Sequence, residues 1–322
     1  MTAASQDAPA PVPGPSSQRP SQTDIAEQQY STHVSLRHRL AERGIDRTLL
    51  LAVPGVVAII ALFCYPFLYG LQLSFQPKTG GVFGAYKAFF DDPYARGSIG
   101  KTFDLAIPAS LINVGASVPI SYRMRREFRG KRILLALLVV PITLGTVLTA
   151  EGLLEYLGPV GWFNKTLQLL HLTSGPVQLV NNYWGVLFSL VITGFPFAFL
   201  LTHAYLSGIH PSLEAAAATL GAGSWQRMRH ITLPLLLPGL LTTFCLTFVL
   251  AFAVFPSAQL VGDPAGQTHV ISIEAVHDAL EEFNYPLGSA VAMIMTALML
   301  AVIGIAMGLR SRLYKGSTGG KG

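Results

Sequence analysis

Charged residues are scarce in this chain of 322 residues. Aspartate, glutamate, lysine and arginine make up 12% of the sequence, whereas a soluble domain usually has about 25%. Hydrophobic residues make up 51%, and the mean hydropathy is +0.48. Length alone would suggest a soluble protein of about two domains. The shortage of charge argues against that class and favours a protein that buries its apolar surface in a membrane.

The chain has few cysteines and lacks the common catalytic motifs. The two cysteines, Cys64 and Cys245, lie in apolar runs, where a cysteine is expected to be a small buried hydrophobic residue. The chain has no GxxxxGK[ST] sequence, no nucleophile elbow and no HExxH sequence. We therefore expect no catalytic residue, no metal site and no cofactor bound by this chain. The basic clusters lie in short loops, so membrane orientation explains them without nucleic acid.

The first residues of the chain have the composition of a disordered segment. Residues 1–30 are rich in Pro, Ser, Gln and Ala, and such a segment cannot bury enough apolar surface to fold. No apolar run of the signal-peptide type follows the first methionine. We expect a disordered cytoplasmic tail over residues 1–45, a transmembrane domain over 46–312, and a second cytoplasmic tail over 313–322.

Long apolar runs make up most of the remaining sequence. A spanning helix needs about 20 mostly apolar residues, and six runs reach this length. Several contain proline, which a spanning helix tolerates because neighbouring helices can satisfy the freed carbonyl groups. The predicted fold is all-α, a polytopic membrane protein with six transmembrane helices. The expected spans are 48–73, 102–122, 132–156, 183–206, 235–260 and 286–309.

The loops between these spans differ sharply in charge. Loops on one side of the membrane, together with both chain ends, carry 17 of the 22 lysine and arginine residues. By the positive-inside rule this side is cytoplasmic, so both termini are predicted to be cytoplasmic. The loop between the fifth and sixth spans has no basic residue and is expected to be external. Its acidic residues are Asp263, Glu274, Asp278, Glu281 and Glu282.

A short, partly polar stretch interrupts the apolar pattern on the cytoplasmic side. Residues 214–234 read EAAAATLGAGSWQRMRHITLP. Alanine is the strongest helix former, serine is a good N-cap, and glycine and proline end helices. The stretch therefore predicts two short helices around a glycine turn. The expected features are a cap at Ser212, a helix over 213–220, a turn over 221–223, a cap at Ser224, a helix over 225–231 and a stop at Pro234. On composition alone, a loop lying amphipathically on the membrane surface explains the stretch equally well.

This stretch resembles the EAA motif in permease subunits of bacterial ABC importers. The motif has Glu-Ala-Ala, a glycine, an isoleucine ten residues later and then Leu-Pro, and Gly221, Ile231, Leu233 and Pro234 stand at those intervals. In that family the segment, here 211–234, is the coupling helix that docks on the ATP-hydrolysing subunit. The resemblance implies that the ATPase-coupling residues are Glu214, Ala215, Ala216, Gly221, Ala222, Arg227, Arg229, Ile231, Leu233 and Pro234.

The glutamate of the stretch departs from the family pattern by one residue. Counted back from Gly221, the family's glutamate falls at Ala215, whereas the chain has its glutamate at 214. One residue on a helix is a rotation of about 100°. We therefore expect Glu214 to reach a basic group in another direction, with Arg227 and Arg229 as alternative charged contacts.

The resemblance extends over nearly all of residues 45–312. Further matching stretches are YPFLYGLQLSF, FGAYKAFFDDP, GPVGWFNKTLQLLHL, HPSLEAAAATLGA and FNYPLGSA. The chain looks most like the spermidine/putrescine-type branch, which implies a small cationic solute such as a polyamine. Other branches of the family serve sugars, phosphonates, iron and thiamine. The family implies these partners in a bacterial inner membrane: two ATP-binding cassette subunits that bind ATP and Mg²⁺, a second homologous permease, an external solute-binding protein and the lipid bilayer.

Two carboxylates in the third span are candidates for the solute path. Glu151 and Glu155 are four residues apart and share one face of a helix. An ionisable residue inside a span usually faces the interior of the bundle, where this pair would attract a cation. Alternatively the span ends near Gly152, and both carboxylates lie in the external interface.

Two other function classes compete with an ATP-driven importer. A secondary carrier works without ATP and would be favoured by inverted repeats and paired broken helices, but no clear internal repeat occurs. A membrane-embedded enzyme would need a polar catalytic cluster, and the sequence shows none.

Overall fold

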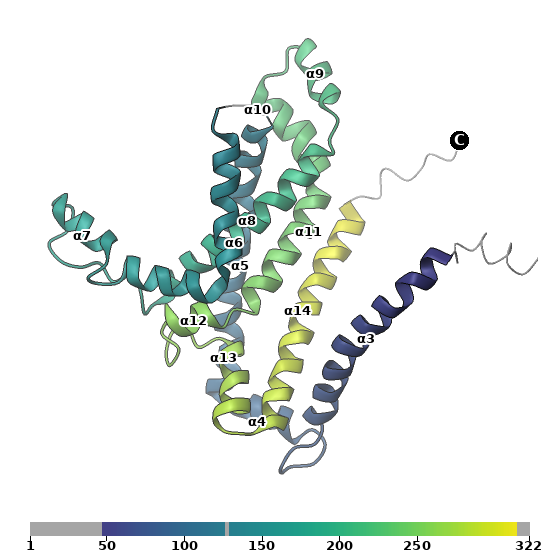
Figure 1. Ribbon diagram of the computed structural model, residues 1–322, viewed down its shortest axis with the longest axis vertical. Coiled ribbons are helices and arrows are strands. Elements are labelled where there is room, and N and C mark those ends of the chain that lie inside the picture. The colour runs from purple at the N-terminus through teal and green to yellow at the C-terminus, as the bar shows by residue number, and fades with distance from the viewer. Residues whose placement is uncertain (1–46, 126–128, 314–322) are drawn as a thin grey trace, which may run out of the picture. The chain divides into compact units, whose positions relative to one another are not determined.

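The computed structural model describes residues 47–125 and 129–313, and these residues form helices and no strand (Figure 1). This confirms the predicted all-α class. The long helices are α3 (Arg47–Ser74), α5 (Pro93–Met124), α6 (Lys131–Leu157), α8 (Tyr183–Ser207), α11 (Leu233–Phe252) and α14 (Tyr285–Leu313). The short helices are α4 (Gly84–Asp91), α7 (Trp162–Leu169), α9 (Pro211–Thr219), α10 (Ser224–Arg227), α12 (Pro256–Leu260) and α13 (Ile271–Val276), with π-helical turns at η1 (Met228–Thr232) and η2 (His277–Glu281).

Six of the helical segments are long and apolar enough to cross a membrane, as the sequence predicted. The second of them begins at Pro93, nine residues before the predicted start at 102. Asp92 caps it, since its carboxylate accepts a hydrogen bond of 2.8 Å from the backbone N–H of Tyr94. Proline suits the first turn because that turn's N–H groups have no partner in the helix. The cap and the proline together extend the helix into the preceding loop.

The fifth span ends earlier than predicted. We expected it to reach residue 260, but α11 ends at Phe252, and α12 begins separately at Pro256. Proline has no N–H to donate to the preceding turn and suits the first position of a helix, so Pro256 favours a new helix start at this position. The prediction extended the span because residues 253–255 and 258 continue the apolar run on both sides of Pro256 and Ser257.

The chain divides into two compact units, Met1–Tyr65 and Pro66–Gly322. The described part of the first unit is the N-terminal part of α3. The second unit holds all the other helices. The tail expected over 1–45 lies outside the described residues, as do residues 126–128 of the basic loop. Of the tail expected over 313–322, only Leu313 is described, as the last residue of α14.

The core of the larger unit forms where α5, α8 and α11 pack together. Phe248 and Phe252 of α11 are fully buried there. Polar side chains link the helices inside the same core: Asn113 Nδ2 of α5 donates to the carbonyl oxygen of Leu190 in α8 at 3.3 Å. In a membrane, hydrogen bonds of this kind help to hold helices together.

Helix α6 bends sharply at Gly145. This residue has φ +75° and ψ 174°, which is not helical, and glycine adopts such a conformation without steric cost. The bend separates residues 131–144 from the later part of α6, and the two parts run in different directions (Figure 1).

Candidate functional site

The coupling segment, residues 211–234, contains the two short helices that the sequence predicted. The first, α9, covers Pro211–Thr219, close to the expected 213–220. Its cap is His210, however, and the expected cap at Ser212 is wrong. Proline at the first position starts the helix one residue after His210, so Ser212 already lies in the first turn. The His210 ring accepts from the backbone N–H of Ser212 at 3.4 Å and contacts the Ser212 hydroxyl at 2.8 Å.

Gly221 ends α9 in a left-handed conformation, with φ +84°. The backbone N–H of Ala222 donates to the carbonyl of Ala217 at 3.0 Å, and the N–H of Gly221 donates to that of Ala218 at 3.0 Å. These two bonds form a Schellman motif, which satisfies the last carbonyl groups of a helix and favours glycine at this position. The glycine of the family pattern is therefore required by the local backbone.

The second short helix differs from the prediction. Gly223, not Ser224, is its N-cap, and α10 covers only Ser224–Arg227. The chain then passes through the π-helical turn η1 directly into α11. The expected stop at Pro234 is wrong, because this proline lies in the first turn of α11. Proline disturbs the regular hydrogen bonds of the preceding turn, and the wider π turn lies immediately before it.

The tip of the coupling segment exposes large apolar side chains. Leu220 is 88% exposed, Trp225 is 66% exposed, and neither α9 nor α10 buries a residue. Ala215 and Ala216 are exposed as well, and small side chains of this kind let another surface approach closely. Ile231 and Leu233 are half-buried, and Leu233 packs against the cluster of Leu206, Leu236 and Leu240.

Glu214 points back toward the helix bundle. Its Oε1 lies 2.5 Å from Arg125 Nη1 at the end of α5 and accepts from Thr232 Oγ1 at 2.7 Å. Its Oε2 accepts from the hydroxyl of Tyr122 at 3.3 Å. Sequence reasoning missed all three partners. The expected basic partner exists, but it comes from a helix 89 residues away in the sequence.

The two arginines of the coupling segment differ in exposure. Arg227 is half-buried, and its Nη2 donates to Ser224 Oγ at 3.0 Å, while its Nη1 lies 3.5 Å from the backbone carbonyl of Glu214. Arg229 is exposed. Of the two arginines, Arg229 is thus the more accessible to a carboxylate of another protein.

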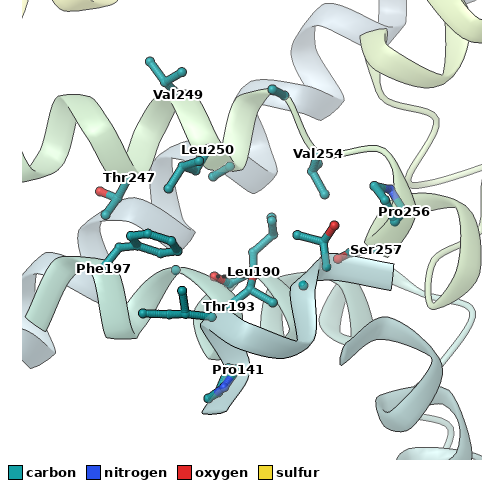
Figure 2. A pocket seen from close by; sticks show the side chains of 16 residues that line it. Pro141, Leu190, Thr193, Phe197, Thr247, Val249, Leu250, Val254, Pro256 and Ser257 are labelled. Carbon is teal, nitrogen blue, oxygen red and sulfur yellow. Dashed lines mark hydrogen bonds between the residues drawn. The ribbon is translucent and has the colours of Figure 1, made fainter. Parts of the chain in front are cut away.

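A cavity of about 500 Å³ lies between α6, α8 and the end of α11 (Figure 2). Gly145, where α6 bends, and the next residue, Thr146, both line the cavity. No charged side chain lines it. Its other polar lining residues are Thr193, Thr247 and Ser257.

Glu151 and Glu155 do not line this cavity. Both follow the bend in α6, and both are exposed. The structure therefore places the pair on the outer surface of the single chain, where lipid, a second subunit or water can contact it.

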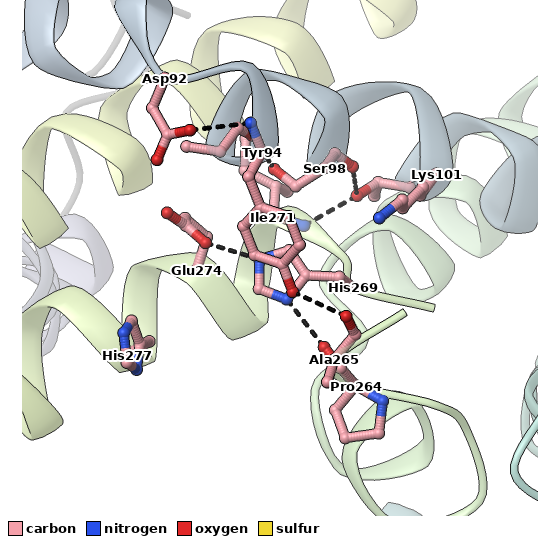
Figure 3. A network of polar contacts seen from close by, with 12 residues as sticks. Asp92, Tyr94, Ser98, Lys101, Pro264, Ala265, His269, Ile271, Glu274 and His277 are labelled. Atoms are coloured by element: carbon pink, nitrogen blue, oxygen red, sulfur yellow. Dashed lines mark hydrogen bonds and ion pairs between the residues drawn. The ribbon is translucent and has the colours of Figure 1, made fainter. Parts of the chain in front are cut away.

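The opposite end of the larger unit from the coupling segment holds a polar network (Figure 3). His269 Nε2 lies 2.5 Å from Glu274 Oε2, and His269 Nδ1 lies 2.8 Å from the carbonyl of Pro264. The ring of Tyr94 in α5 lies over the His269 ring with 4.3 Å between centroids. This network fastens the loop between α11 and α14 to the start of α5.

Asp278 is a buried carboxyl group beside this network. It is 4% exposed, and its Oδ2 has no hydrogen-bond partner among the described residues. Burial, followed by the nearby charges of Glu274 and Glu282, raises the pKa of Asp278 from 3.8 to about 7. The pKa of the neighbouring His277 is also raised, chiefly because its ring hydrogen-bonds to Glu281.

Among the described residues, no group of histidine, cysteine and carboxylate side chains is arranged to hold a metal ion.

Comparison with known proteins agrees with the helical architecture. Residues 98–314 match the model of the family described as binding-protein-dependent transport system inner membrane component. The chain is 29% identical to the probable sulfate transport system permease protein cysT of Prototheca wickerhamii, over 66% of this chain and 82% of that protein. It is 27% identical to the spermidine/putrescine transport system permease protein PotB of Haemophilus influenzae, over 76% of this chain and 87% of that protein.

A solved structure with a similar fold supports the same architecture. It is a chain of the bacterial alginate ABC transporter in complex with a periplasmic protein bound to an alginate pentasaccharide. The TM-score is 0.74 at 19% identity, and the match covers 86% of this chain and 98% of the other. At this identity the likeness concerns the fold alone.

Proposed function

The chain belongs to the family of binding-protein-dependent transport system inner membrane components, and we propose that its coupling segment, residues 211–234, docks on an ATP-hydrolysing partner. The chain is a permease subunit of an ABC importer and a multi-pass protein of the inner membrane. It is a transport subunit without enzymatic activity of its own, since ATP hydrolysis in such an importer belongs to partner subunits.

The exposed apolar tip of the coupling segment is the observation that carries this proposal. Exposing leucine and tryptophan to water does not stabilise a loop. Exposed apolar patches rimmed by polar residues mark interaction sites. Leu220 and Trp225 are such groups, and Arg229 is an exposed charge nearby. The same surface contains the glycine turn of the EAA-like pattern.

The orientation is part of the proposal. Glu214 contacts Arg125, which belongs to the most basic loop of the chain. The coupling segment and the basic loop thus lie on one side, which the positive-inside rule assigns to the cytoplasm. With six spans, both termini would be cytoplasmic too.

We further propose the assembly of the working importer. This chain pairs with a second, homologous permease, two ATP-binding cassette subunits with ATP and Mg²⁺ bind the coupling segments, and an external solute-binding protein docks on the opposite face. The solute path would run between the two permeases. The residues that line the uncharged cavity beside Gly145 would form part of the wall of this path.

For the solute we propose a small cation such as a polyamine. The exposed carboxylates of Glu281 and Glu282 on the external face, and those of Glu151 and Glu155, would raise the local concentration of a cation. Relatives at similar identity are named for sulfate and for spermidine/putrescine. Another solute, such as a sugar, a phosphonate, iron, thiamine or sulfate, is therefore the alternative to test. An ATP-independent secondary carrier is disfavoured by the family membership.

Co-purification tests the docking proposal. A tagged chain, extracted from its own membranes in mild detergent, should retain an ATP-binding subunit that mass spectrometry identifies. Leu220→Asp should lower the retained ATPase by about tenfold, the effect of losing a central apolar contact at an interface. The matched control is Leu169→Asp in α7, because Leu169 is also exposed, at 78%, but lies outside the coupling segment. Equal retention by both variants would refute docking through this tip.

A further inference from the structure

The carboxylate of Glu214 joins three parts of the chain that are distant in sequence. It lies in the first turn of α9 and contacts Arg125 and Tyr122 of the α5 end and Thr232 of η1. Arg125 also donates from Nη2 to the carbonyl of Ile209 at 2.6 Å, in the connection that leads into α9. The end of α5, the coupling helix and the entry to α11 therefore meet at one ion pair.

The pair is well shielded for a loop on a membrane surface. The Arg125 and Glu214 side chains are 17% and 16% exposed. Hydrogen bonds between ionised groups are shorter and stronger than those between neutral groups, and partial burial reduces the screening that weakens exposed pairs. Thr232 is almost completely buried. This contact is consequently stiffer than a solvent-exposed ion pair would be.

The rest of α9 is held loosely. The helix buries no residue, so packing contributes little to fixing its position. A partner that moved α9 would act on the bundle mainly through the two chain connections and through the contacts of Glu214. The longer of these connections includes the glycine turn at Gly221.

Both oxygens of Glu214 are already occupied within the chain. Oε1 accepts from Arg125 and Thr232, and Oε2 accepts from Tyr122. This leaves little capacity for a bond to an arginine or lysine of another subunit. The side chains that α9 presents outward are instead those of Ala215 and Ala216.

We propose that Glu214 is an internal strut, which carries the displacement of the coupling helix to the end of α5 and, through Thr232, to the start of α11. It is a positioning residue that does not touch the solute or the ATPase. The inference rests on the proposed function, because it assumes that α9 is the element that the ATPase moves. Coupling of this kind travels through a contiguous network of contacts, and double-mutant cycles measure it.

The test is a double-mutant cycle on Arg125→Ala and Glu214→Ala in the assembled transporter, in a chain with both native cysteines replaced. Thr146→Cys supplies a reporter in the cavity beside Gly145. The readout is the change in its labelling rate by an impermeant maleimide when ATP and orthovanadate trap the ATPase. We expect about a tenfold change without the two alanine substitutions, within the usual range for coupling between sites. Each single variant should lose most of this change, and the double variant should lose no more than either.

Retained ATPase distinguishes the strut from direct docking. All three variants should keep the wild-type amount of bound ATPase. Additive losses in the cycle, or loss of bound ATPase by Glu214→Ala but not by Arg125→Ala, would overturn the proposal. If the alanine variants do not fold, Thr232→Val and Tyr122→Phe take their place: a partial loss of the labelling change supports the strut, and an unaltered change refutes it.

A second arm separates failure of the strut from failure of the proposed function. If the native chain binds no ATPase, the proposed function fails, and hydrogen exchange of residues 210–232 in the purified permease then decides the strut. Glu214→Gln and Arg125→Gln should each speed exchange in α9 to the same extent. Unchanged exchange would contradict the strut.

Discussion

Arg125 Nη1 and Glu214 Oε1 lie 2.5 Å apart, although 89 residues separate them in the sequence. The contact explains the one-residue offset of the glutamate from the family pattern. A shift of one position turns a side chain by about 100° around the helix. At position 214 the carboxylate faces the bundle, while Ala215, which stands at the family's glutamate position, is exposed.

The glycine turn of the coupling segment should tolerate substitution at only one of its two glycines. Gly221 has φ +84°, so Gly221→Val should destabilise the turn by about 1–3 kcal/mol, the usual cost of a strained backbone residue. Gly223 has φ −67°, so Gly223→Ala is the matched control and should be nearly neutral. The measurements are thermal unfolding and vanadate-sensitive ATP hydrolysis by the assembled transporter. Equal effects of both variants would contradict the role of the left-handed turn.

The close approach of α8 and α11 should depend on Gly239. A Cβ atom at this position would lie 2.5 Å from Cγ of Tyr205, so Gly239→Ala should force the helices apart and cost about 1–3 kcal/mol. Gly115 in α5 has open space around its Cβ position, which makes Gly115→Ala the control. Thermal unfolding in detergent should show a lower Tm for Gly239→Ala only. An unchanged Tm would mean that Tyr205 moves aside at no cost.

The buried carboxyl of Asp278 should make stability fall as the pH rises. Its pKa is raised from 3.8 to about 7, so between these values the folded state holds a proton that the unfolded state releases. The free energy of unfolding then falls through this window, by at most about 1.4 kcal/mol per pH unit. The raised pKa of His277 acts in the same direction, because its stabilising charge is lost at high pH.

Asp278→Asn isolates the larger part of this effect. The Tm of the wild type should fall from about pH 5 to about pH 8, and the Tm of the variant should change much less. His277 contributes to the slope that remains. Parallel curves for the two proteins would contradict a protonated Asp278 in the folded state.

Filling the cavity beside Gly145 should block transport without disturbing assembly. Thr146→Trp introduces a bulky side chain into the cavity of about 500 Å³ and narrows it. Uptake by intact cells should be abolished, while the amount of co-purified ATPase stays unchanged. Leu137→Trp, on the same helix at a position that is 62% exposed and outside the cavity, is the control. Normal uptake by Thr146→Trp would show that the solute takes another path.

The acidic pair of α6 tests the charge of the solute. If the solute is a cation attracted by Glu151 and Glu155, the double change to glutamine should raise the KM for uptake several-fold and leave the maximal rate nearly unchanged, because only the local concentration of solute falls. Increasing the ionic strength should reduce the difference between the two proteins. Radiolabelled spermidine and sulfate are suitable first probes. An unaltered KM for the transported probe would remove the pair from the solute path.

The sequence predicted the membrane spans well because their length and hydropathy are local properties. It also predicted Gly221 at the end of α9, since a glycine after an alanine-rich run is a local signal. It did not predict the break at Pro256 or the π turn before Pro234, because whether a helix bends or stops at a proline depends on its neighbours. Arg125 and Thr232 were missed as partners of Glu214, since contacts between distant segments leave no pattern in a single sequence.

Cross-linking from the tip of the coupling segment tests the central claim most directly. Replacing Cys64 and Cys245 gives a chain without cysteine, into which Leu220→Cys introduces a single attachment point for a photoactivatable maleimide. In the native membrane, illumination should join this position to an ATP-binding subunit, and Leu169→Cys should give no such product. A product with the ATPase from position 169 but none from position 220 would contradict docking through the coupling segment.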